Sequence, residues 1–549
     1  MTRRVIQIDP RDNVFVALVN LKSGEVVDCA GKSLTLVSDV PAKHKFALKT
    51  FAPGDQVVMY GVIVGTAVKP IASGEAVSTT NIRHQASPFL PQQNDFHWFA
   101  PDVSKWKNRT FLGYPRSDGQ VGTRNYWLVV PLVFCENKNI QVLKQAFEEE
   151  LGFAAPQVYR QQVAEMARLY RDGKLTQLSD EFRAGDGSHA SSPRLFENVD
   201  GIRFLLHEGG CGGTHEDSRN LCGLLAGYIH HPNVAGATVL SLGCQHAQIR
   251  ILQEEIRKRN SQFDKPLFIF EQQQSGSESA MMTQAIRQTF LGLAEANKAQ
   301  RTPAPLSKLC VGLKCGGSDG FSGISANPAI GHASDLLAAL GGRTILSEFP
   351  ELCGVEQNLI DRGRSKEVGD RFIRLMTDYA ARAAAVRATF EMNPSPGNVK
   401  DGLLTDAMKS AGAAKKGGTS PVTAALDYPE YSTEAGLNLQ CTPGNDVECV
   451  TAQVGAGASV VLFTTGLGTP TGNPVAPVVK LSTNSALAKK MQDIIDIDTG
   501  PIVEGQTTIE QTGEAILDYV IEVASGRALT KAEQKAQEDF IPWKRGVSL

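Results

Sequence analysis

The stretch LKCGGSDGFSGISANPAIG, residues 313–331, holds more glycine and small hydroxyl side chains than a packed core would use. The apolar segment SKLCVGL (307–313) leads into it, and SDLLAALGG (334–342) follows with helical spacing. A strand, a glycine-rich loop and a helix form the repeating unit of parallel sheets, whose ligands bind at the carboxyl ends of the strands. Because glycine lets the backbone approach a ligand closely, we predict a ligand-binding loop here.

The same alternation begins near residue 109. NYWLVVPLVFC (125–135), GIRFLLHEGG (201–210) and GATVLSLGCQH (236–246) are predicted strands, each followed by a segment with helical spacing. Long helices are predicted near 366–391 and 507–526. We therefore expect two α/β domains with mainly parallel sheets, at 109–302 and 303–549.

The first 85 residues show a different pattern. Short apolar runs such as VFVALVNL (14–21) and DQVVMYGVIVGTAV (55–68) are separated by Gly, Asp and Pro turns, which predicts a small all-β module of the β-clip type at 1–85. Residues 86–108 are polar and proline-rich, which is typical of an extended linker. The predicted fold class is therefore a multidomain α/β protein with an N-terminal all-β domain.

The composition indicates which kinds of partner the protein lacks and in which compartment we expect it. The 549 residues carry a net charge of −3, so no basic field favours a nucleic acid or an anionic membrane. No window approaches the roughly 18 consecutive apolar residues of a membrane helix, and the N-terminus lacks a signal-peptide pattern. Ten cysteines are too sparse for a disulfide scaffold, so we expect reduced thiols and a cytoplasmic location.

Three cysteines follow apolar strands at strand-to-loop junctions: Cys211, Cys244 and Cys315. Buried cysteines that act as small hydrophobes are the alternative interpretation, but these three have glycine neighbours and stand just past the apolar run. Three thiolates from separate loops could hold an iron–sulfur cluster with one open iron, or help to bind a single ferrous ion. No close C-x-x-C spacing supports the cluster, so both forms stay open.

Several basic and polar residues are candidates for proton transfer or substrate binding. His207 and His215 flank Cys211, and His44 and Lys45 begin a strand of the β-module; each could equally be structural. In FLGYPRSDGQVGTRNYW (111–127), Arg116, Arg124 and Asn125 offer donors that suit a carboxylate or polyol. The loops NPSPGN, TPGND and TTGLGTPTGNP add polar groups at strand ends, and no nucleotide-binding fingerprint is present.

Together, GYPRSDGQVGTRNYW, GCGG, LGCQ, CGGSDGFSGISANPAIG, NPSPGN, TPGND and FTTGLGTPTG resemble the altronate dehydratase/galactarate dehydratase family. DNVFVAL, HKFAL and YGVIVGTA look like the SAF (β-clip) domain of that family. The resemblance covers nearly the whole chain, and GVEQNLI and KLSTNSALAKKMQDIIDIDTG favour the altronate branch. One segment departs from the family: AVSTTN (76–81) has Ser78 and Thr80 where the altronate members tend to carry histidines.

The resemblance implies a hydro-lyase that removes the C2 proton and the 3-hydroxyl of a sugar acid, with D-altronate as the leading substrate. It also implies iron, with manganese as another divalent candidate, and directs Cys315 toward the metal and Ser318 and Asp319 toward substrate hydroxyls. Further residues expected at the substrate come from the polar loops: Asn445, Asp446 and Thr469. The catalytic candidates are Lys45 and His44, followed by His207 and His215.

Alternatives stay open at this point. The same chemistry could act on galactarate or another hexonate or hexarate, a sulfo-lyase is a more distant relative, and the pocket could serve a non-catalytic sugar-acid sensor. A sensor would need an output module, and no DNA-reading helix pair or basic patch is present. The expected partner is a small sugar acid, and the sequence leaves a homo-oligomer open.

Overall fold

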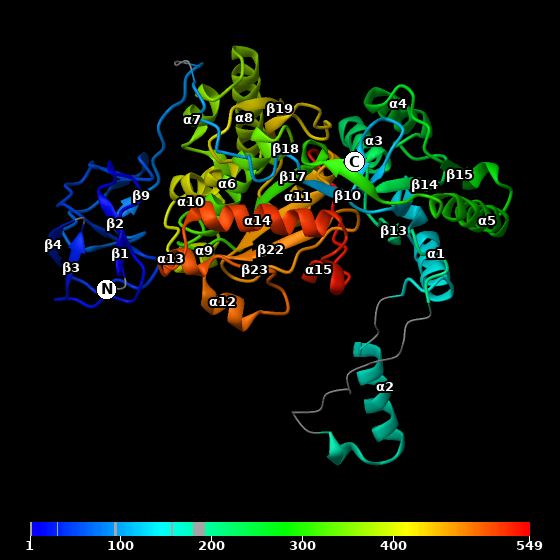
Figure 1. Ribbon diagram of the computed structural model, residues 1–549, viewed down its shortest axis with the longest axis horizontal. Helices are drawn as coiled ribbons and strands as arrows, with labels where there is room; N and C mark the ends of the chain where they lie inside the picture. Colours follow the sequence, from blue (N-terminus) through cyan, green and yellow to red (C-terminus); the bar gives the residue numbers. More distant parts are fainter. Residues whose placement is uncertain (1–2, 30, 93–95, 155–157, 179–192) are drawn as a thin grey trace.

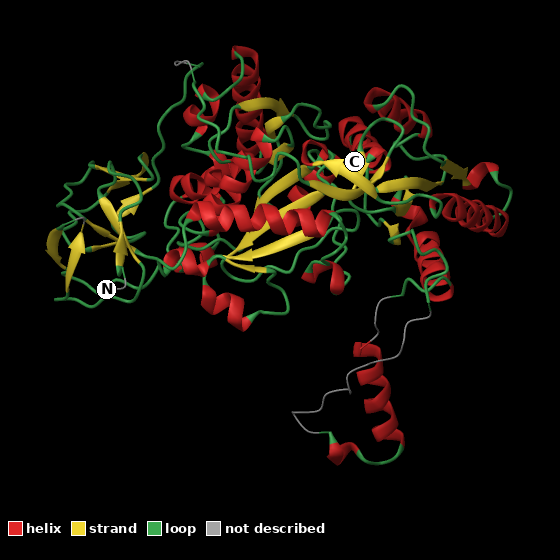
Figure 2. Cartoon of the chain, in the orientation of Figure 1, coloured by secondary structure: helices red, strands yellow, loops and turns green. Residues whose placement is uncertain are grey.

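The computed structural model describes residues 3–29, 31–92, 96–154, 158–178 and 193–549 (Figure 1). Three strand-rich or mixed regions follow one another along the chain, and the β-module at the N-terminus lies beside the largest sheet (Figure 2). The predicted fold class, an all-β N-terminal module followed by α/β domains with parallel sheets, is confirmed.

The N-terminal module is built from short antiparallel strands in a four-stranded sheet (β1-β2-β5-β8), a three-stranded sheet (β6-β7-β9) and a hairpin (β3-β4). A core that includes Phe15, Phe46 and Val40 fills one side of the module. The strands are β1 (Val5–Ile6), β2 (Val14–Ala17), β3 (Val26–Cys29), β4 (Lys32–Thr35), β5 (Lys45–Ala47), β6 (Gln56–Met59), β7 (Val62–Ala67), β8 (Ala76–Val77) and β9 (Ile82–Arg83).

The second region contains a four-stranded parallel sheet in the order β13-β12-β14-β15, and a small antiparallel sheet, β11-β10-β16. Its strands are β10 (Thr110–Pro115), β11 (Val121–Gly122), β12 (Tyr126–Pro131), β13 (Gly201–Phe204), β14 (Val234–Ser241), β15 (Leu267–Glu271) and β16 (Thr302–Pro305). Its helices are α1 (Asn137–Glu150), α2 (Val158–Arg171), α3 (His215–His230), α4 (Ile249–Arg259) and α5 (Glu278–Ala296).

The C-terminal region is organised around a seven-stranded parallel sheet in the order β19-β20-β18-β17-β21-β22-β23. Its strands are β17 (Cys310–Cys315), β18 (Arg343–Leu346), β19 (Val422–Leu426), β20 (Gly436–Gln440), β21 (Val460–Thr465), β22 (Val478–Ser482) and β23 (Ile497–Asp498). Its helices are α6 (Ala326–Ala339), α7 (Glu356–Asp361), α8 (Lys366–Ala385), α9 (Pro396–Lys400), α10 (Asp406–Ala413), α11 (Asp446–Gly455), α12 (Ser485–Lys490), α13 (Gly500–Val503), α14 (Ile509–Ala524) and α15 (Lys531–Gln534).

The two parallel sheets share one layer of helices. Along β12, Trp127 and Val129 face a core with α1 and α5, whereas Leu128 and Val130 face a core with α3 and α4. The second of these cores continues into α11 and β21 of the C-terminal sheet, and α14 and α6 cover the other face of that sheet. Because β12 is buried on both faces, it is an uninterrupted apolar run, as parallel strands usually are.

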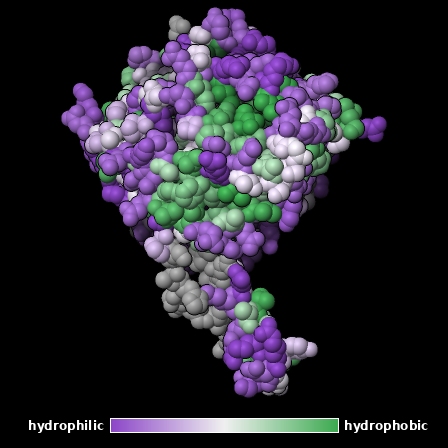
Figure 3. All heavy atoms as spheres, turned by 90° about the vertical axis from the view of Figure 1, so that its right-hand side faces the viewer, coloured by the Kyte–Doolittle hydropathy of each residue, from purple (hydrophilic) through white to green (hydrophobic). Residues whose placement is uncertain are grey.

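The surface of the second region has an apolar face, and the described helices include no candidate membrane span. Figure 3 shows apolar side chains gathered on the face of the second region, where Figure 1 places α5 and the edge strand β15. Among the described residues, no helix combines the length and the hydropathy that a bilayer crossing would need.

Candidate active site

A cavity of about 730 Å³ opens at the carboxyl edge of the seven-stranded sheet. Its lining comes from the loops after four strands: Gly317 follows β17, Glu351 follows β18, Asp446 follows β20 and Thr471 follows β21. Strand β17 has β18 on one side and β21 on the other, so the order of the strands reverses at this point. Ligands of open parallel sheets bind at such reversal points, which makes this cavity the candidate active site.

A thiol and two carboxylates meet at the floor of the cavity. The ligand atoms of Cys315, Glu348 and Glu351 all lie within 4.8 Å of one another, and all three side chains are buried. The Cys315 thiol donates to Glu351 Oε2 at 3.5 Å. Burial raises the pKa of Cys315 to about 11, although the Lys416 ammonium acts in the opposite direction.

Three buried lysines neutralise these acids. Lys416 Nζ lies 2.7 Å from both Cys315 Sγ and Glu348 Oε2, and Lys314 pairs with Glu348 and, at 2.9 Å, with Asp446. Lys409 Nζ lies 2.8 Å from Glu351 Oε1 and donates to Asn393. Burial opposes the charge on Lys416, but the acidic neighbours outweigh it and raise its pKa. The cluster therefore balances three ammonium groups against three carboxylates.

The donor chemistry at Cys315 is that of a transition-metal site, since it combines sulfur with carboxylate oxygen. As the side chains lie, however, the Lys416 ammonium already occupies the position between Cys315 Sγ and Glu348 Oε2. A divalent ion at this point would have to displace that ammonium from buried acids that it neutralises. The residues around Cys315 thus do not fit the iron that the sequence resemblance implies.

The loop at residues 313–331 needs glycine at two positions, because other parts of the chain approach its backbone closely there. A Cβ atom on Gly316 would lie 2.5 Å from Asp446 Oδ2, and one on Gly320 would lie 2.5 Å from the Lys43 carbonyl oxygen. Any larger residue would therefore move either the cavity wall or the β-module away from the loop. The predicted Ser318 lines the cavity, but Asp319 does not line it.

Asp319 is instead a buried anchor for the β-module. Its carboxylate is fully buried, accepts hydrogen bonds from Ser322 and Thr483, and lies 3.0 Å from Lys43 Nζ. Lys43 also pairs with Asp401 at 2.8 Å. The acid that the resemblance directs toward substrate hydroxyls therefore fixes one domain on another.

Of the three other residues predicted at the substrate, two line the cavity and one does not. Asn445 and Asp446 line the cavity at the N-terminus of α11, and the Asn445 side chain caps that helix by accepting from the backbone N–H of Val447 and Glu448. Thr469 lies beside Gly317, with its hydroxyl 2.8 Å from where a Cβ on that glycine would be. It adjoins the cavity but does not line it, whereas Thr471 does.

The two basic residues predicted in the β-module do not reach the cavity. Lys45 is fully buried and donates to the carbonyl oxygens of Lys43 and Gly402. Burial lowers the pKa of Lys45 to about 7. His44 Nε2 lies 3.0 Å from the Lys400 carbonyl oxygen, and burial lowers its pKa. Both residues therefore join the module to the chain near α9, and neither is placed to reach a substrate.

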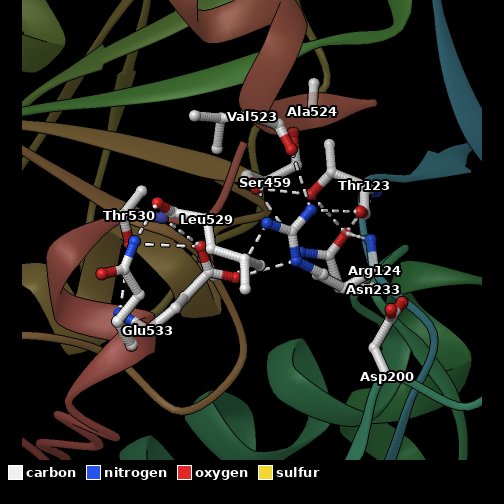
Figure 4. A network of polar contacts seen from close by, with 12 residues as sticks. Thr123, Arg124, Asp200, Asn233, Ser459, Val523, Ala524, Leu529, Thr530 and Glu533 are labelled. Atoms are coloured by element: carbon white, nitrogen blue, oxygen red, sulfur yellow. Dashed lines mark hydrogen bonds and ion pairs between the residues drawn. The ribbon is translucent and has the colours of Figure 1, made fainter. Parts of the chain in front are cut away.

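Arg116, Arg124 and Asn125 are structural rather than substrate-binding, and Figure 4 shows the polar network around Arg124. Arg124 is 2% exposed; it pairs with Glu533 and donates to the carbonyl oxygens of Thr123 and Val523. Arg116 donates to the Pro232 carbonyl oxygen at 2.7 Å, and the Asn125 amide donates to backbone carbonyls at Asn198 and Ala296. Their donors hold the second region together and attach it to α14 and α15.

The structure separates the three predicted metal cysteines. Cys211 and Cys244 are exposed in the second region, and Cys211 lines a different cavity of about 650 Å³, whereas Cys315 is buried at the floor of the first. A single site shared by these three thiols is therefore wrong. The strands that carry them belong to two different sheets, a distinction that spacing along the chain does not reveal.

The two histidines beside Cys211 also lie away from the first cavity. His207 is buried: its Nε2 lies 2.8 Å from the Pro131 carbonyl oxygen, its Nδ1 accepts from the Gly209 N–H, and burial lowers its pKa to about 4. This neutral imidazole is held by two backbone groups. His215 is exposed and begins α3, with its ring centroid 5.5 Å from that of His246.

Sequence reasoning missed the acids and lysines that lie at the cavity floor and beneath it. Glu348 and Glu351 follow β18, so their position past a strand end was a usable signal. Lys409 and Lys416 had no such signal, because they belong to a helix and a short turn after it. Cys135 was assigned to a strand, but β12 ends at Pro131 and the cysteine follows in a 3₁₀ turn.

Family models match the three regions of the chain in order. The altronate/galactarate dehydratase SAF domain matches residues 3–85, the D-galactarate dehydratase/altronate hydrolase second domain matches 113–297, and the D-galactarate/altronate dehydratase C-terminal model matches 306–548.

Curated relatives match over nearly the full length. The altronate dehydratase of Bacillus subtilis (strain 168) is 34% identical, with 99% of both chains covered, and that of Escherichia coli (strain K12) is 33% identical, again with 99% of both chains covered. The galactarate dehydratase (L-threo-forming) of Escherichia coli (strain K12) is 30% identical, over 96% of this chain and 94% of the relative. By these matches, the chain belongs to the altronate/galactarate dehydratase family.

Proposed function

We propose that this protein is a sugar-acid hydro-lyase that converts D-altronate to 2-dehydro-3-deoxy-D-gluconate and water. The full-length similarity to two altronate dehydratases supports the reaction class. The observation that carries the assignment to the cavity is its lining, which combines the Asp446 carboxylate and the Lys409 ammonium with small hydroxyl and amide groups. Such groups suit a polyhydroxylated carboxylate.

The reaction requires one proton to leave C2 and one hydroxyl to leave C3. The C2–H electron pair forms the C2–C3 double bond as the C3–O bond breaks, and the departing hydroxide takes up a proton to become water. The resulting enol then tautomerises to the 2-keto acid. A base is needed to accept the C2 proton, and a cation is needed where negative charge develops on the substrate carboxylate.

Asp446 is proposed as the base. Its side chain is 27% exposed, which makes it more accessible than Glu351 at 3%, and one of its oxygens pairs with Lys314 while the other lies beside Gly316. Lys409 is proposed to bind the substrate carboxylate. It is the basic residue among the described residues that line this cavity.

A second candidate substrate is galactarate, because a galactarate dehydratase is 30% identical to this chain. Galactarate carries a carboxylate at each end, whereas the described lining of the cavity offers one lysine and no arginine. A monocarboxylate leaves no second charge to be buried without a partner. This difference favours altronate.

Iron remains part of the proposed holoenzyme, since the sequence resemblance implies it. When bound, iron would act as a Lewis acid toward carboxylate and hydroxyl oxygens. All ten cysteines are free thiols, which suits a reducing compartment, so we place the proposed reaction in the cytoplasm.

The test is turnover of a panel of aldonates and aldarates under anaerobic conditions with ferrous iron, with the 2-keto-3-deoxy product detected. Altronate should be converted faster than galactarate, and no turnover of any panel member would refute the proposal. Asp446→Asn should lower kcat by about 10²–10⁴. Glu448→Gln is the matched control, because Glu448 belongs to the same helix but lines the other cavity.

We also propose that the enzyme forms a homo-oligomer through the apolar face of the second region (Figure 3). Strand β15 leaves its outer edge unpaired within the sheet, and Phe290 and Leu291 of α5 are 41% and 52% exposed. Contiguous apolar surface of this kind marks an association site. Sedimentation velocity should give at least a dimer, and Phe290→Glu should shift it toward the monomer; a monomeric wild-type protein would refute the proposal.

A further inference from the structure

Three of the ten cysteines are exposed: Cys135, Cys211 and Cys244. All ten belong to the described residues; six of the others are buried and Cys353 is partly buried. Free cysteine is usually a buried residue type. Three exposed thiols in one region of the chain therefore need an explanation other than packing.

The three exposed thiols follow three adjacent strands of one sheet. Cys135 follows β12, Cys211 follows β13 and Cys244 follows β14, and β12 lies between the other two strands. All three strands are parallel, so their carboxyl ends share one edge. The strand order reverses at β12, and this edge is where open parallel sheets bind ligands.

Direct contacts join the loops that carry these thiols. The Phe134 N–H donates to the Gly209 carbonyl oxygen at 3.1 Å, which ties the Cys135 loop to the Cys211 loop. The Ala247 N–H donates to the Gly210 carbonyl oxygen at 3.0 Å, which ties the Cys211 loop to the Cys244 loop. The three thiols thus come from loops that form one continuous surface.

The backbone around Cys211 suits an anionic, thiolate-ligated group. Gly210 and Gly212, on either side of it, have φ of +101° and +66°, and Gly243 before Cys244 has φ of +123°. Positive φ at these glycines lets the backbone bend closely around the two cysteines and leaves room for a group bound to their sulfur atoms.

We propose that Cys135, Cys211 and Cys244 hold an iron–sulfur cluster, with one iron left without a protein thiolate. The cysteines provide the soft ligands that such clusters require. The three thiols do not form a group whose ligand atoms all lie within 4.8 Å of one another, as Cys315, Glu348 and Glu351 do. Thiolates around a cluster stand farther apart than ligands that share one ion, so this arrangement is compatible with a cluster.

This site also accounts for the iron that the cavity around Cys315 does not accommodate. In the first cavity the position between the donors is held by Lys416, whereas no lysine is hydrogen-bonded to any of the three exposed thiols among the described contacts. The cluster proposal is independent of the proposed dehydration, because it follows from the strand order, the loop contacts and the exposure of the three thiols.

The test is the iron and acid-labile sulfide content of the full-length protein, purified anaerobically and reconstituted with ferrous iron and sodium sulfide. Wild type should hold about four iron and four sulfide per chain, with an electron paramagnetic resonance signal after reduction by dithionite. Cys135→Ser, Cys211→Ser and Cys244→Ser should each lose most of the sulfide and the signal. Cys353→Ser and Cys315→Ser are the matched controls and should retain both.

Each outcome decides the proposal. Iron without sulfide in wild type, or sulfide retained in all three variants, would overturn it. Circular dichroism on each variant separates loss of the cluster from loss of the fold. A protein that holds the cluster but converts no sugar acid would refute the proposed function alone, whereas turnover by a protein without sulfide would refute this inference alone.

Discussion

Lys416 shows how single residues set the chemistry of the candidate site. Its ammonium lies 2.7 Å from a thiol and from a buried carboxylate, and all three side chains are removed from solvent. In this position lysine supplies the positive charge that a metal ion would otherwise provide. Together with Lys314, the same residue pairs with the buried Glu348 carboxylate.

Removing the positive charge of Lys416 should destabilise the folded protein. Lys416→Met leaves Glu348 with one ammonium partner instead of two, so the free energy of unfolding should fall by about 3–5 kcal/mol. Denaturant unfolding measures the change. Lys535→Met breaks a partly exposed pair with Asp493 and should change stability by no more than about 1 kcal/mol. Equal effects of the two substitutions would contradict the buried role.

Lys45 should make stability depend on pH. Burial lowers its pKa in the folded protein to about 7 from an ordinary value of 10.5. Between these values the unfolded chain binds one more proton than the folded chain, so stability rises with pH, by up to about 1.4 kcal/mol per pH unit. Below about pH 7 both states are protonated and the full cost of burying the charge is present.

The measurement is the difference in unfolding free energy between wild type and Lys45→Met at pH 7, 8 and 9. The free energy of unfolding of wild type should rise relative to that of Lys45→Met with each increase in pH. A difference that stays constant across this range would show that the folded protein keeps Lys45 protonated.

Ser318, which the resemblance directs toward the substrate, and Asn445 and Asp446, which the polar loops suggested, all line the cavity, and their contact with a substrate stays a prediction. Residue type did not suffice for Arg124 and Asn125, because a donor suited to a substrate carboxylate is equally suited to backbone carbonyls. Which acceptor a donor meets depends on neighbours from distant parts of the chain, here α14 and residues 198 and 296.

At the scale of elements, helix α11 begins at the cavity wall because Asn445 caps it. The Asn445 side chain accepts from two backbone N–H groups, at 3.0 and 3.2 Å. Asn445→Ala should therefore lower the free energy of unfolding by about 1 kcal/mol, whereas Asn445→Ser should keep most of the stability. Denaturant unfolding compares the two variants, and equal losses would show that the cap contributes little.

The existence of these strands and helices was largely predictable from the sequence. Apolar runs bounded by glycine and proline predicted β12, β14 and β17, and the two helices expected near 366–391 and 507–526 correspond to α8 and α14. Their ends were harder to place. Strand β12 ends four residues before Cys135, because the buried run stops at Val133 and a 3₁₀ turn begins at Phe134, whose side chain is 43% exposed.

At the scale of the whole molecule, the β-module is attached to the C-terminal region through Lys43 and Lys45. Gly320 lies where the two regions meet, and a Cβ there would be 2.5 Å from the Lys43 carbonyl oxygen. Gly320→Ala should push the module away and cost about 1–3 kcal/mol of stability. Hydrogen exchange at β5 should rise and turnover should fall.

Gly397→Ala is the matched control for this substitution, because the nearest atom to its added Cβ would lie 3.6 Å away. It should leave exchange at β5 unchanged. Normal exchange and full activity in Gly320→Ala would show that docking of the β-module tolerates a displacement of the loop.

The sequence by itself determined the class of fold, the order of its regions and the family. Hydrophobic periodicity and glycine-rich motifs depend on residues that are close together in the sequence, so they can be recognised without the structure. The tertiary structure alone decided which strand ends share an edge. That choice separates Cys315 from Cys211 and Cys244 and brings Cys135 to the latter pair. The physical reason is that strand order within a sheet is set by packing between distant segments, which spacing along the chain does not encode.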